Sequence, residues 1–203
     1  MTYTLKREEL GNGLLASVLE ALAKAYKEIG AEVYVVGAAA RDLGLKLLGA
    51  GSAPRRTMDL DVAVLLEKWD EYERLTEILI KDGFVKAPEK QRFYYCGIEN
   101  VRYEVDIVPF GDIAQEEMVA WPPEGNPVMS VRCFADVMKN ADKVSVEDRF
   151  DFRMASLSGQ WLIKLDAWCD RRLMTRKDAA DMQFILENAY ITLALSSDSI
   201  PGT

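Results

Sequence analysis

Two carboxylates stand two residues apart in an otherwise apolar run, Thr57-Met58-Asp59-Leu60-Asp61-Val62-Ala63-Val64. Side chains alternate along a β-strand, so Asp59 and Asp61 are expected on one face, roughly 6.5–7 Å apart. Like charges this close raise each other's pKa unless a cation lies between them, and Mg²⁺ or Mn²⁺ accepts such hard oxygen ligands. The segment therefore predicts a metal site on a strand. From these residues alone, a solvated outer strand face is the alternative.

The composition excludes several kinds of site. The 203 residues contain no histidine, which excludes Ser-His-Asp and Cys-His catalysis and every His-containing metal site. The three cysteines, Cys96, Cys133 and Cys169, are far apart and indicate reduced packing residues. A net charge of −8 argues against a surface devoted broadly to nucleic acid and fits a carboxylate site that needs cations. Because the chain lacks a long apolar run and a signal-peptide pattern, we expect a cytoplasmic protein with no membrane partner.

Hydrophobic periodicity predicts alternating helices and strands. The expected helices are 5–29, a second one running from Gly37 through Leu48, 67–81, 159–172 and 175–188. The expected strands are 33–36, 57–64, 91–97, 101–108, 128–134, 144–146 and 150–155, with a loop at 49–56, a hairpin turn at 98–100 and a frayed tail after 195. A linker rich in proline and glycine at 122–127 indicates a boundary near 112–127. We therefore expect a core over 1–112 and a C-terminal strand/helix subdomain over 113–203, packed on the active-site cleft.

Three features combine into a candidate site. The first is a small-residue turn, Val35-Val36-Gly37-Ala38-Ala39-Ala40, that opens a helix and could bring backbone N–H groups to a phosphate. Tight packing of a helix on a strand is the alternative for this turn. The second is the carboxylate pair, with Arg56 just upstream as a nucleotide-binding candidate, and the third is Asp106 in a later strand. Three carboxylates from neighbouring strands could hold two divalent cations about 3.5–4 Å apart, as in-line displacement at phosphorus requires.

The order of Gly37-Ala38, Asp59-x-Asp61 and Asp106 resembles the pattern hG[GS]…Dh[DE]h…h[DE]h of the nucleotidyltransferase superfamily, the polymerase-β-like minimal fold. The resemblance implies an α+β fold, with a mixed β-sheet flanked by helices and a C-terminal helical portion carrying a few short strands. It implies NMP transfer from an NTP to a hydroxyl acceptor with Mg²⁺ or Mn²⁺. Asp59 and Asp61 would be the paired metal ligands, and Asp106 would complete the metal site and help activate the acceptor. Gly37 and Ala38 would contact the triphosphate through backbone amides.

The C-terminal half narrows the resemblance. The segments 162–172 and 176–182 are similar to the "K…A…R…KDxxD" signature of AbiEii/AbiGii toxin-like nucleotidyltransferases. This implies that Lys164 meets the nucleotide, that Asp178 or Asp181 lies near the site, and that a cognate antitoxin is a partner. A salt bridge between two packed helices is the alternative for Lys164 and Asp181. The chain departs from the superfamily pattern at Ala38, where Gly or Ser is usual, and in a long spacing between Gly37 and Asp59.

The leading prediction is thus a metal-dependent nucleotidyltransferase acting on an RNA or protein acceptor. A rival within the class is CCA-type addition to tRNA ends, because Val36–Leu43 is similar to the VGGxVRDxL turn of those enzymes. The acidic charge and the lack of a long basic C-terminal region count against it. A non-catalytic nucleotide- or partner-binding module on the same fold is the alternative from another class.

Overall fold

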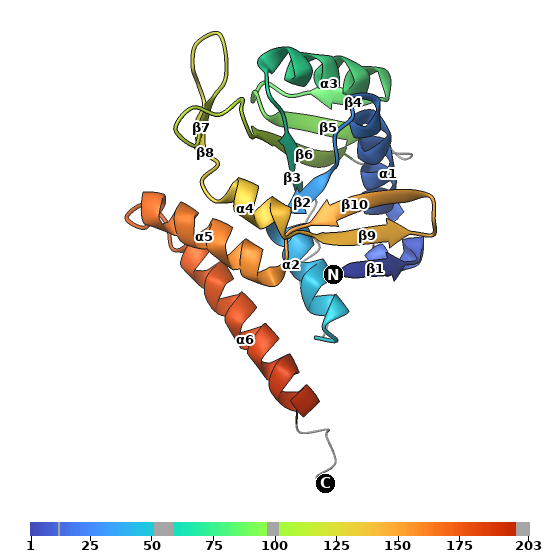
Figure 1. Cartoon of the computed structure of the whole chain (residues 1–203), viewed down its shortest axis with the longest axis vertical. Coiled ribbons are helices and arrows are strands. Elements are labelled where there is room, and N and C mark those ends of the chain that lie inside the picture. Colours follow the sequence, from blue (N-terminus) through green and yellow to red (C-terminus); the bar gives the residue numbers. More distant parts are fainter. Residues whose placement is uncertain (12, 51–58, 97–101, 198–203) are drawn as a thin grey trace.

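The computed structural model describes residues 1–11, 13–50, 59–96 and 102–197, with side chains up to residue 189. Its elements are β1 (Thr2–Leu5), η1 (Arg7–Leu10), α1 (Gly13–Glu28), β2 (Tyr34–Val36), α2 (Gly37–Leu47), β3 (Asp59–Leu65), α3 (Trp69–Lys81), β4 (Phe84–Lys86), β5 (Arg92–Cys96), β6 (Arg102–Phe110), β7 (Met118–Ala120), β8 (Val128–Ser130), α4 (Phe134–Lys139), β9 (Asp142–Val146), β10 (Phe150–Met154), α5 (Leu157–Arg171) and α6 (Lys177–Ser197). The main sheet is mixed, in the order β1-β9-β10-β2-β3-β6-β5-β4, and β7 pairs with β8 (Figure 1). The predicted α+β fold, a mixed sheet flanked by helices, is confirmed.

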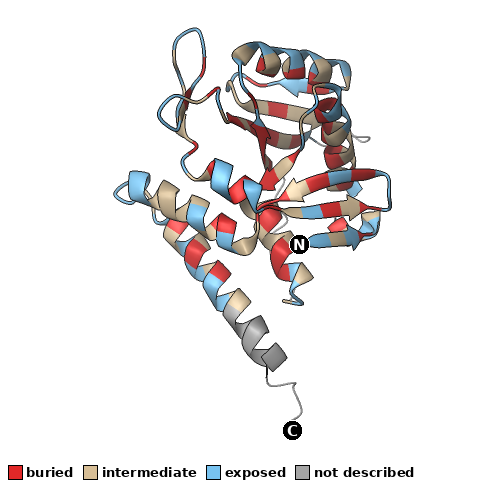
Figure 2. Ribbon diagram, in the orientation of Figure 1, coloured by how far each residue is buried: buried red, intermediate tan, exposed pale blue. Residues whose placement is uncertain are grey.

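The alternation along β3 and β6 assigns the two faces of the sheet. Leu60, Val62 and Val64 are fully buried and belong to the core beneath α1 and α3, together with Val105 and Ile107 of β6. Figure 2 shows this buried interior running through the sheet and its helices. The opposite face therefore carries the intervening carboxylates of both strands. That face is covered in part by a second apolar cluster that includes residues of α4 and of the β7–β8 pair.

The N-terminus differs from the helix that the sequence predicts over 5–29. Residues Thr2–Leu5 form β1, which pairs in parallel with β9, and the first helix begins only at Gly13. The pairing joins segments about 140 residues apart, which periodicity within one window does not reveal. The short elements β4 and α4 were also not predicted, and α6 continues beyond the predicted end at 188 to Ser197. Most of the predicted loop at 49–56, from residue 51 on, and the hairpin turn at 98–100 lie outside the described residues.

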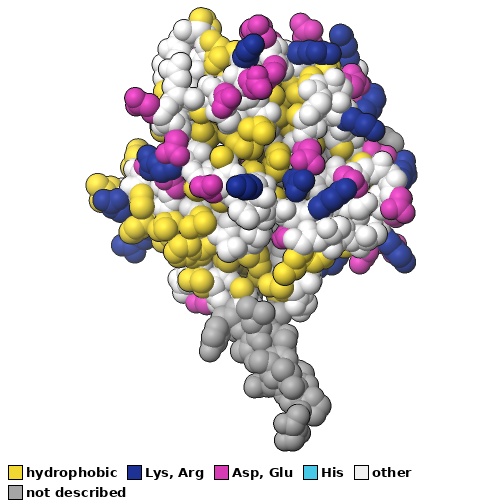
Figure 3. Space-filling view, in the orientation of Figure 1, with side chains coloured by type: hydrophobic (Ala, Val, Ile, Leu, Met, Phe, Trp, Pro, Cys, Tyr) yellow, Lys and Arg dark blue, Asp and Glu magenta, His cyan; other side chains and the backbone are white. Residues whose placement is uncertain are grey.

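The main sheet crosses the domain boundary that the sequence predicts at residue 112. Strands β9 and β10 come from the C-terminal part and lie between β1 and β2. Beyond them, α5 and α6 pack against each other (Figure 1). Positively and negatively charged side chains are interspersed over the face seen in Figure 3. None of the helices in the described ranges has the length and apolar character that crossing a membrane requires.

Candidate active site

The parallel pairing of β3 with β6 brings four carboxylates onto one face of the sheet. Asp61 lies opposite Asp106 and Asp59 lies opposite Glu104 in the register of the two strands. Neighbouring strands are about 4.8 Å apart, so the carboxylates form two adjacent rows. Asp61, Asp106 and Glu104 are partly exposed, and Asp59 is exposed. The predicted placement of the carboxylates on neighbouring strands is confirmed, while their role as ligands stays a prediction.

Gly37 lies directly against this acidic face. It follows Val36, which pairs with Asp61, and it begins α2 with a φ of +67°. A Cβ at Gly37 would stand 2.1 Å from Oδ2 of Asp61. Both the backbone conformation and the close approach therefore require glycine here. Its amide donates a hydrogen bond of 3.1 Å to Oε1 of Gln160 in α5.

The pKa of Asp61 is raised by burial and by its acidic neighbours. Burial, followed by the charges of Asp106 and Asp59, raises the pKa of Asp61 from 3.8 to about 6. Lys164 and Lys177 oppose this rise and lower the pKa of the same carboxyl. The two helices of the C-terminal part thus contribute positive charge that acts on the acidic face. The strand carboxylates retain excess negative charge, which is the condition that favours a bound cation.

Asp106 is engaged by an arginine from the next strand. Arg92 of β5 lies opposite Asp106 in register, and its Nε and Nη2 donate to the two carboxylate oxygens at 2.8 and 2.9 Å. Its Nη1 also lies 2.8 Å from Oε2 of Glu104. Among the residues described, no three acidic side chains stand close enough to hold one metal ion. The backbone is placed for the predicted three-carboxylate site, but the Asp106 side chain is directed to Arg92.

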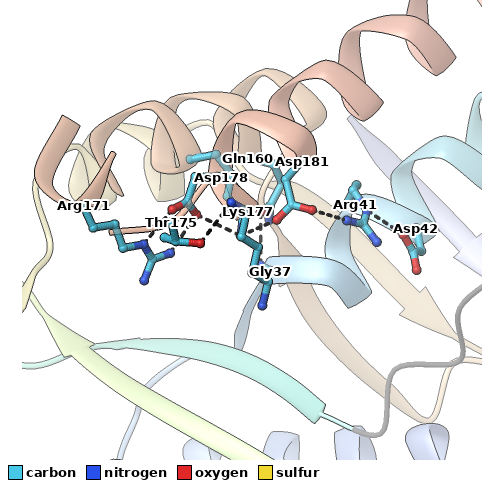
Figure 4. A network of polar contacts seen from close by, with 10 residues as sticks. Gly37, Arg41, Asp42, Gln160, Arg171, Thr175, Lys177, Asp178 and Asp181 are labelled. Atoms are coloured by element: carbon cyan, nitrogen blue, oxygen red, sulfur yellow. Dashed lines mark hydrogen bonds and ion pairs between the residues drawn. The ribbon is translucent and has the colours of Figure 1, made fainter. Parts of the chain in front are cut away.

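A polar network joins α5 and α6 beside Gly37 (Figure 4). Nζ of Lys164 lies 2.8 Å from Asp181 and 3.6 Å from Asp178, and Arg41 of α2 pairs with Asp181 at 2.9 Å. Asp178 is fully buried, and the hydrogen bond from Arg171 is the main cause that lowers its pKa. The interhelical salt bridge considered for Lys164 and Asp181 is therefore present. The predicted contact of Lys164 with a nucleotide stays a prediction.

Several residues of this site were not assigned a role by the sequence. Gln160 is 1% exposed, and its Nε2 has no hydrogen-bond partner in the described structure. Its only signal in the sequence is a polar residue near the start of an otherwise amphipathic helix. No sequence pattern indicates a role for Arg92, because its contact with Asp106 depends on the register of β5 with β6. Lys177 is the lysine of the KDxxD segment, to which no role was assigned. Arg56, which was predicted to bind the nucleotide, lies outside the described residues.

A surface hollow elsewhere lacks the features of this site. It has a volume of about 870 Å³ and lies between α1 and the β9–β10 hairpin. Its charges are largely paired: Arg149 with Glu20, Arg153 with Glu32, and Lys143 with Asp151, at distances of 2.8 to 3.0 Å. On the face of β3 and β6, by contrast, Arg92 pairs with the β6 carboxylates, while Asp59 and Asp61 of β3 form no ion pair among the described side chains.

Comparisons with known proteins support the fold. No protein-family model matches the sequence, and no curated protein sequence matches it. Among solved structures, the chain is similar to an antigenic nucleotidyltransferase-like protein from Paracoccidioides brasiliensis, with a TM-score of 0.55 and 16% identity over 92% of this chain and 78% of that chain. A weaker likeness is to the lincomycin-bound lincosamide antibiotic adenylyltransferase LnuA, with a TM-score of 0.45 and 13% identity over 89% of this chain and 96% of that chain. Another is to the Thermotoga maritima CCA-adding enzyme in complex with tRNA, with a TM-score of 0.32 and 24% identity over 50% of this chain and 23% of that chain. The fold is thus of the nucleotidyltransferase type, and the narrower resemblance to AbiEii/AbiGii proteins stays a prediction.

Proposed function

We propose that this protein is a metal-dependent nucleotidyltransferase that transfers NMP from an NTP to a hydroxyl acceptor. The observation that carries the proposal is the register of β3 with β6, which sets Asp61 opposite Asp106 immediately beside the glycine that begins α2. Carboxylates next to a helix N-terminus provide both a cation site and an anion site within one small region. A nucleoside triphosphate bound to a divalent cation needs this combination.

The donor set fits a divalent cation. Burial and then the charges of Asp106 and Asp59 raise the pKa of Asp61, and carboxylate oxygens are the ligands that Mg²⁺ and Mn²⁺ prefer. Asp59 and Asp61 would hold the ion. When bound, such an ion lowers the pKa of an attacking hydroxyl and neutralises charge on the leaving pyrophosphate.

The protein's own cations and amides would bind the phosphates. Lys164 and Lys177 already act electrostatically on Asp61, so phosphate oxygens next to the metal ligands would meet their positive charge. The first amides of a helix have no partner within the helix, and Gln160 occupies that of Gly37. Ala38 and the amides after it are therefore the proposed donors to the triphosphate, and Gly37 supplies the close approach.

The acceptor and the biological role extend the proposal. We propose an RNA or protein hydroxyl as acceptor, a cytoplasmic location, and the role of a toxin with a cognate antitoxin. This part is supported by the sequence resemblance of 162–182 to the AbiEii/AbiGii signature. Induced expression of the chain should then arrest growth of a host cell. The Asp61→Asn variant at equal protein level should not, and arrest by both proteins would contradict the toxin role.

The direct test measures binding and transfer separately. We expect NTP with Mg²⁺ to raise the melting temperature more than NTP with EDTA. Incubation with radiolabelled NTPs should then transfer label to total RNA or to protein. Asp61→Asn should lose the label. Label confined to tRNA 3′ ends would favour CCA-type addition, and a folded sample with no metal-dependent shift and no label would contradict the proposed function.

A second candidate is a non-catalytic nucleotide-binding module. The bidentate pair between Arg92 and Asp106 favours it, because it engages the third carboxylate. This candidate predicts a rise in melting temperature with NTP that is equal in the wild type and in Asp106→Asn, and no label transfer in either. Loss of transfer in Asp106→Asn from an active wild type would eliminate it.

A further inference from the structure

The guanidinium of Arg92 joins the two acidic side chains of β6. Its Nε and Nη2 contact Asp106, and its Nη1 contacts Glu104 at 2.8 Å. Asp106 and Glu104 are two residues apart on one strand, so a single planar guanidinium reaches both. The side chain of Arg92 is 28% exposed, so it has open space into which it can move.

This contact opposes a cation at Asp106. Both oxygens of Asp106 accept hydrogen bonds from Arg92, and a dication on the same oxygens would be repelled by the guanidinium charge. Asp61, which faces Asp106 across the strand pair, forms no hydrogen bond or ion pair with an arginine among the described side chains. The site therefore has two parts. Asp59 and Asp61 on β3 are free of Arg92, whereas the oxygens of Asp106 on β6 are occupied by it.

Glu104 provides the alternative partner that a displaced Arg92 needs. If Asp106 turns toward β3, the guanidinium loses two hydrogen bonds but keeps its ion pair with Glu104. Release of Asp106 thus does not leave a charged side chain without a partner. Two arrangements follow: Arg92 shared between both carboxylates, and Arg92 on Glu104 alone.

We propose that Arg92 is a positioning residue that competes with the divalent cation for Asp106, and that Glu104 retains Arg92 when Asp106 joins the metal site. The inference rests on the proposed function, because it concerns the metal of that site. Its consequence is that the cation binds weakly without nucleotide. The phosphates of the nucleotide supply further oxygen ligands, and this added affinity overcomes the competition.

The test is Mn²⁺ binding to the full chain, read from the electron paramagnetic resonance signal of free Mn²⁺, with and without a nonhydrolysable NTP. Without nucleotide, Arg92→Gln should bind Mn²⁺ about tenfold more tightly than the wild type, equivalent to about 1.4 kcal/mol. Arg92→Lys should fall between the two, because a lysine keeps the positive charge but lacks the rigid pair of N–H groups with which the guanidinium matches the carboxylate. The matched control is Arg153→Gln, which removes a 2.8 Å pair with Glu32 away from the site and should leave Mn²⁺ binding unchanged.

The role of Glu104 is tested by a double-mutant cycle. Glu104→Gln should weaken Mn²⁺ binding more when Arg92 is present than in the Arg92→Gln background, because only then does the guanidinium depend on Asp106 alone. Equal losses in both backgrounds would show that Glu104 contributes only its charge. That result would overturn its assigned role.

The outcomes separate this inference from the proposed function. Nucleotide-dependent Mn²⁺ binding in the wild type, with no gain in either Arg92 variant at an unchanged melting temperature, would overturn the inference and leave the function standing. The pair would then be a structural contact between strands. No Mn²⁺ binding to any variant, with or without nucleotide, would refute the proposed metal site and the inference with it.

Discussion

Replacing Asp61 by asparagine should stabilise the protein while abolishing the proposed nucleotidyl transfer. The side chain keeps its shape beside Gly37, where a Cβ would stand 2.1 Å from Oδ2 of Asp61, but it loses its charge. That charge is unfavourable in the metal-free fold, since burial and the charges of Asp106 and Asp59 raise its pKa from 3.8 to about 6. A shift of this size corresponds to about 3 kcal/mol of stability lost above pH 6. Because Asp61 is partly exposed, solvent screening reduces the effect, and we expect a gain of about 1–3 kcal/mol for Asp61→Asn at pH 7.5.

The stability gained by Asp61→Asn should depend on pH in a way that a change in packing alone would not produce. The folded protein holds the Asp61 proton more tightly than the unfolded chain does. The stabilisation from protonation is therefore complete below 3.8 and is lost as the pH rises through about 6. The advantage of Asp61→Asn should accordingly shrink by about half between pH 7.5 and pH 5. An advantage that does not change with pH would point to packing.

The assay is urea unfolding in EDTA, followed by tryptophan fluorescence, at both pH values. Asp151→Asn is the control of opposite sign, because the hydrogen bond from Lys143 lowers the pKa of Asp151, and its loss should cost a little stability. With Mg²⁺ and NTP, only the wild type should gain stability and transfer label. If Asp61→Asn unfolds more easily than the wild type at pH 7.5, the Asp61 charge is not the destabilising feature that we infer.

Three further substitutions test neighbouring parts of the account. Gly37→Ala should cost about 1–3 kcal/mol and abolish the proposed transfer, because it combines a φ of +67° with a clash against the carboxylate of Asp61. Gly30→Ala, at a φ of +75° with nothing near its Cβ, should cost only the backbone strain, and equal losses in urea unfolding would contradict the close approach. Lys164→Ala should weaken nucleotide binding, measured by calorimetry, by about tenfold, as loss of a charge-assisted contact does, and should lower stability by less than about 2 kcal/mol. A larger loss of stability with normal nucleotide affinity would show that Lys164 forms only a structural salt bridge. Asp178→Asn should destabilise the fold by about 2–4 kcal/mol, because it is fully buried against two cations, and unchanged unfolding would contradict that.

The local pattern was sufficient to predict the acidic strand and, separately, the small-residue turn at Gly37. Alternation fixes which residues of 59–64 face the core, and burial of Leu60 and Val62 confirms it. That Asp106 would lie beside Asp61 was a hypothesis about neighbouring strands, which the resemblance to the superfamily pattern supported. Periodicity says nothing about which strands pair.

The contacts that the sequence did not predict depend on register and on long-range packing. The Arg92–Asp106 pair follows from how β5 aligns with β6, and the hydrogen bond from Gly37 to Gln160 joins residues more than a hundred positions apart. The strand at Thr2–Leu5 exists because β9 offers it an edge. Such features are set by tertiary structure, which overrides local propensity.

The central claim is that Asp59 and Asp61 bind a divalent cation that carries an NTP. Crystals grown with Mn²⁺ and a nonhydrolysable NTP test it most directly, because manganese is located by its anomalous scattering. The account predicts manganese about 2.1 Å from oxygens of both carboxylates, with the phosphates at the N-terminus of α2. An ordered nucleotide with its manganese elsewhere, or bound without contact to either carboxylate, would contradict it.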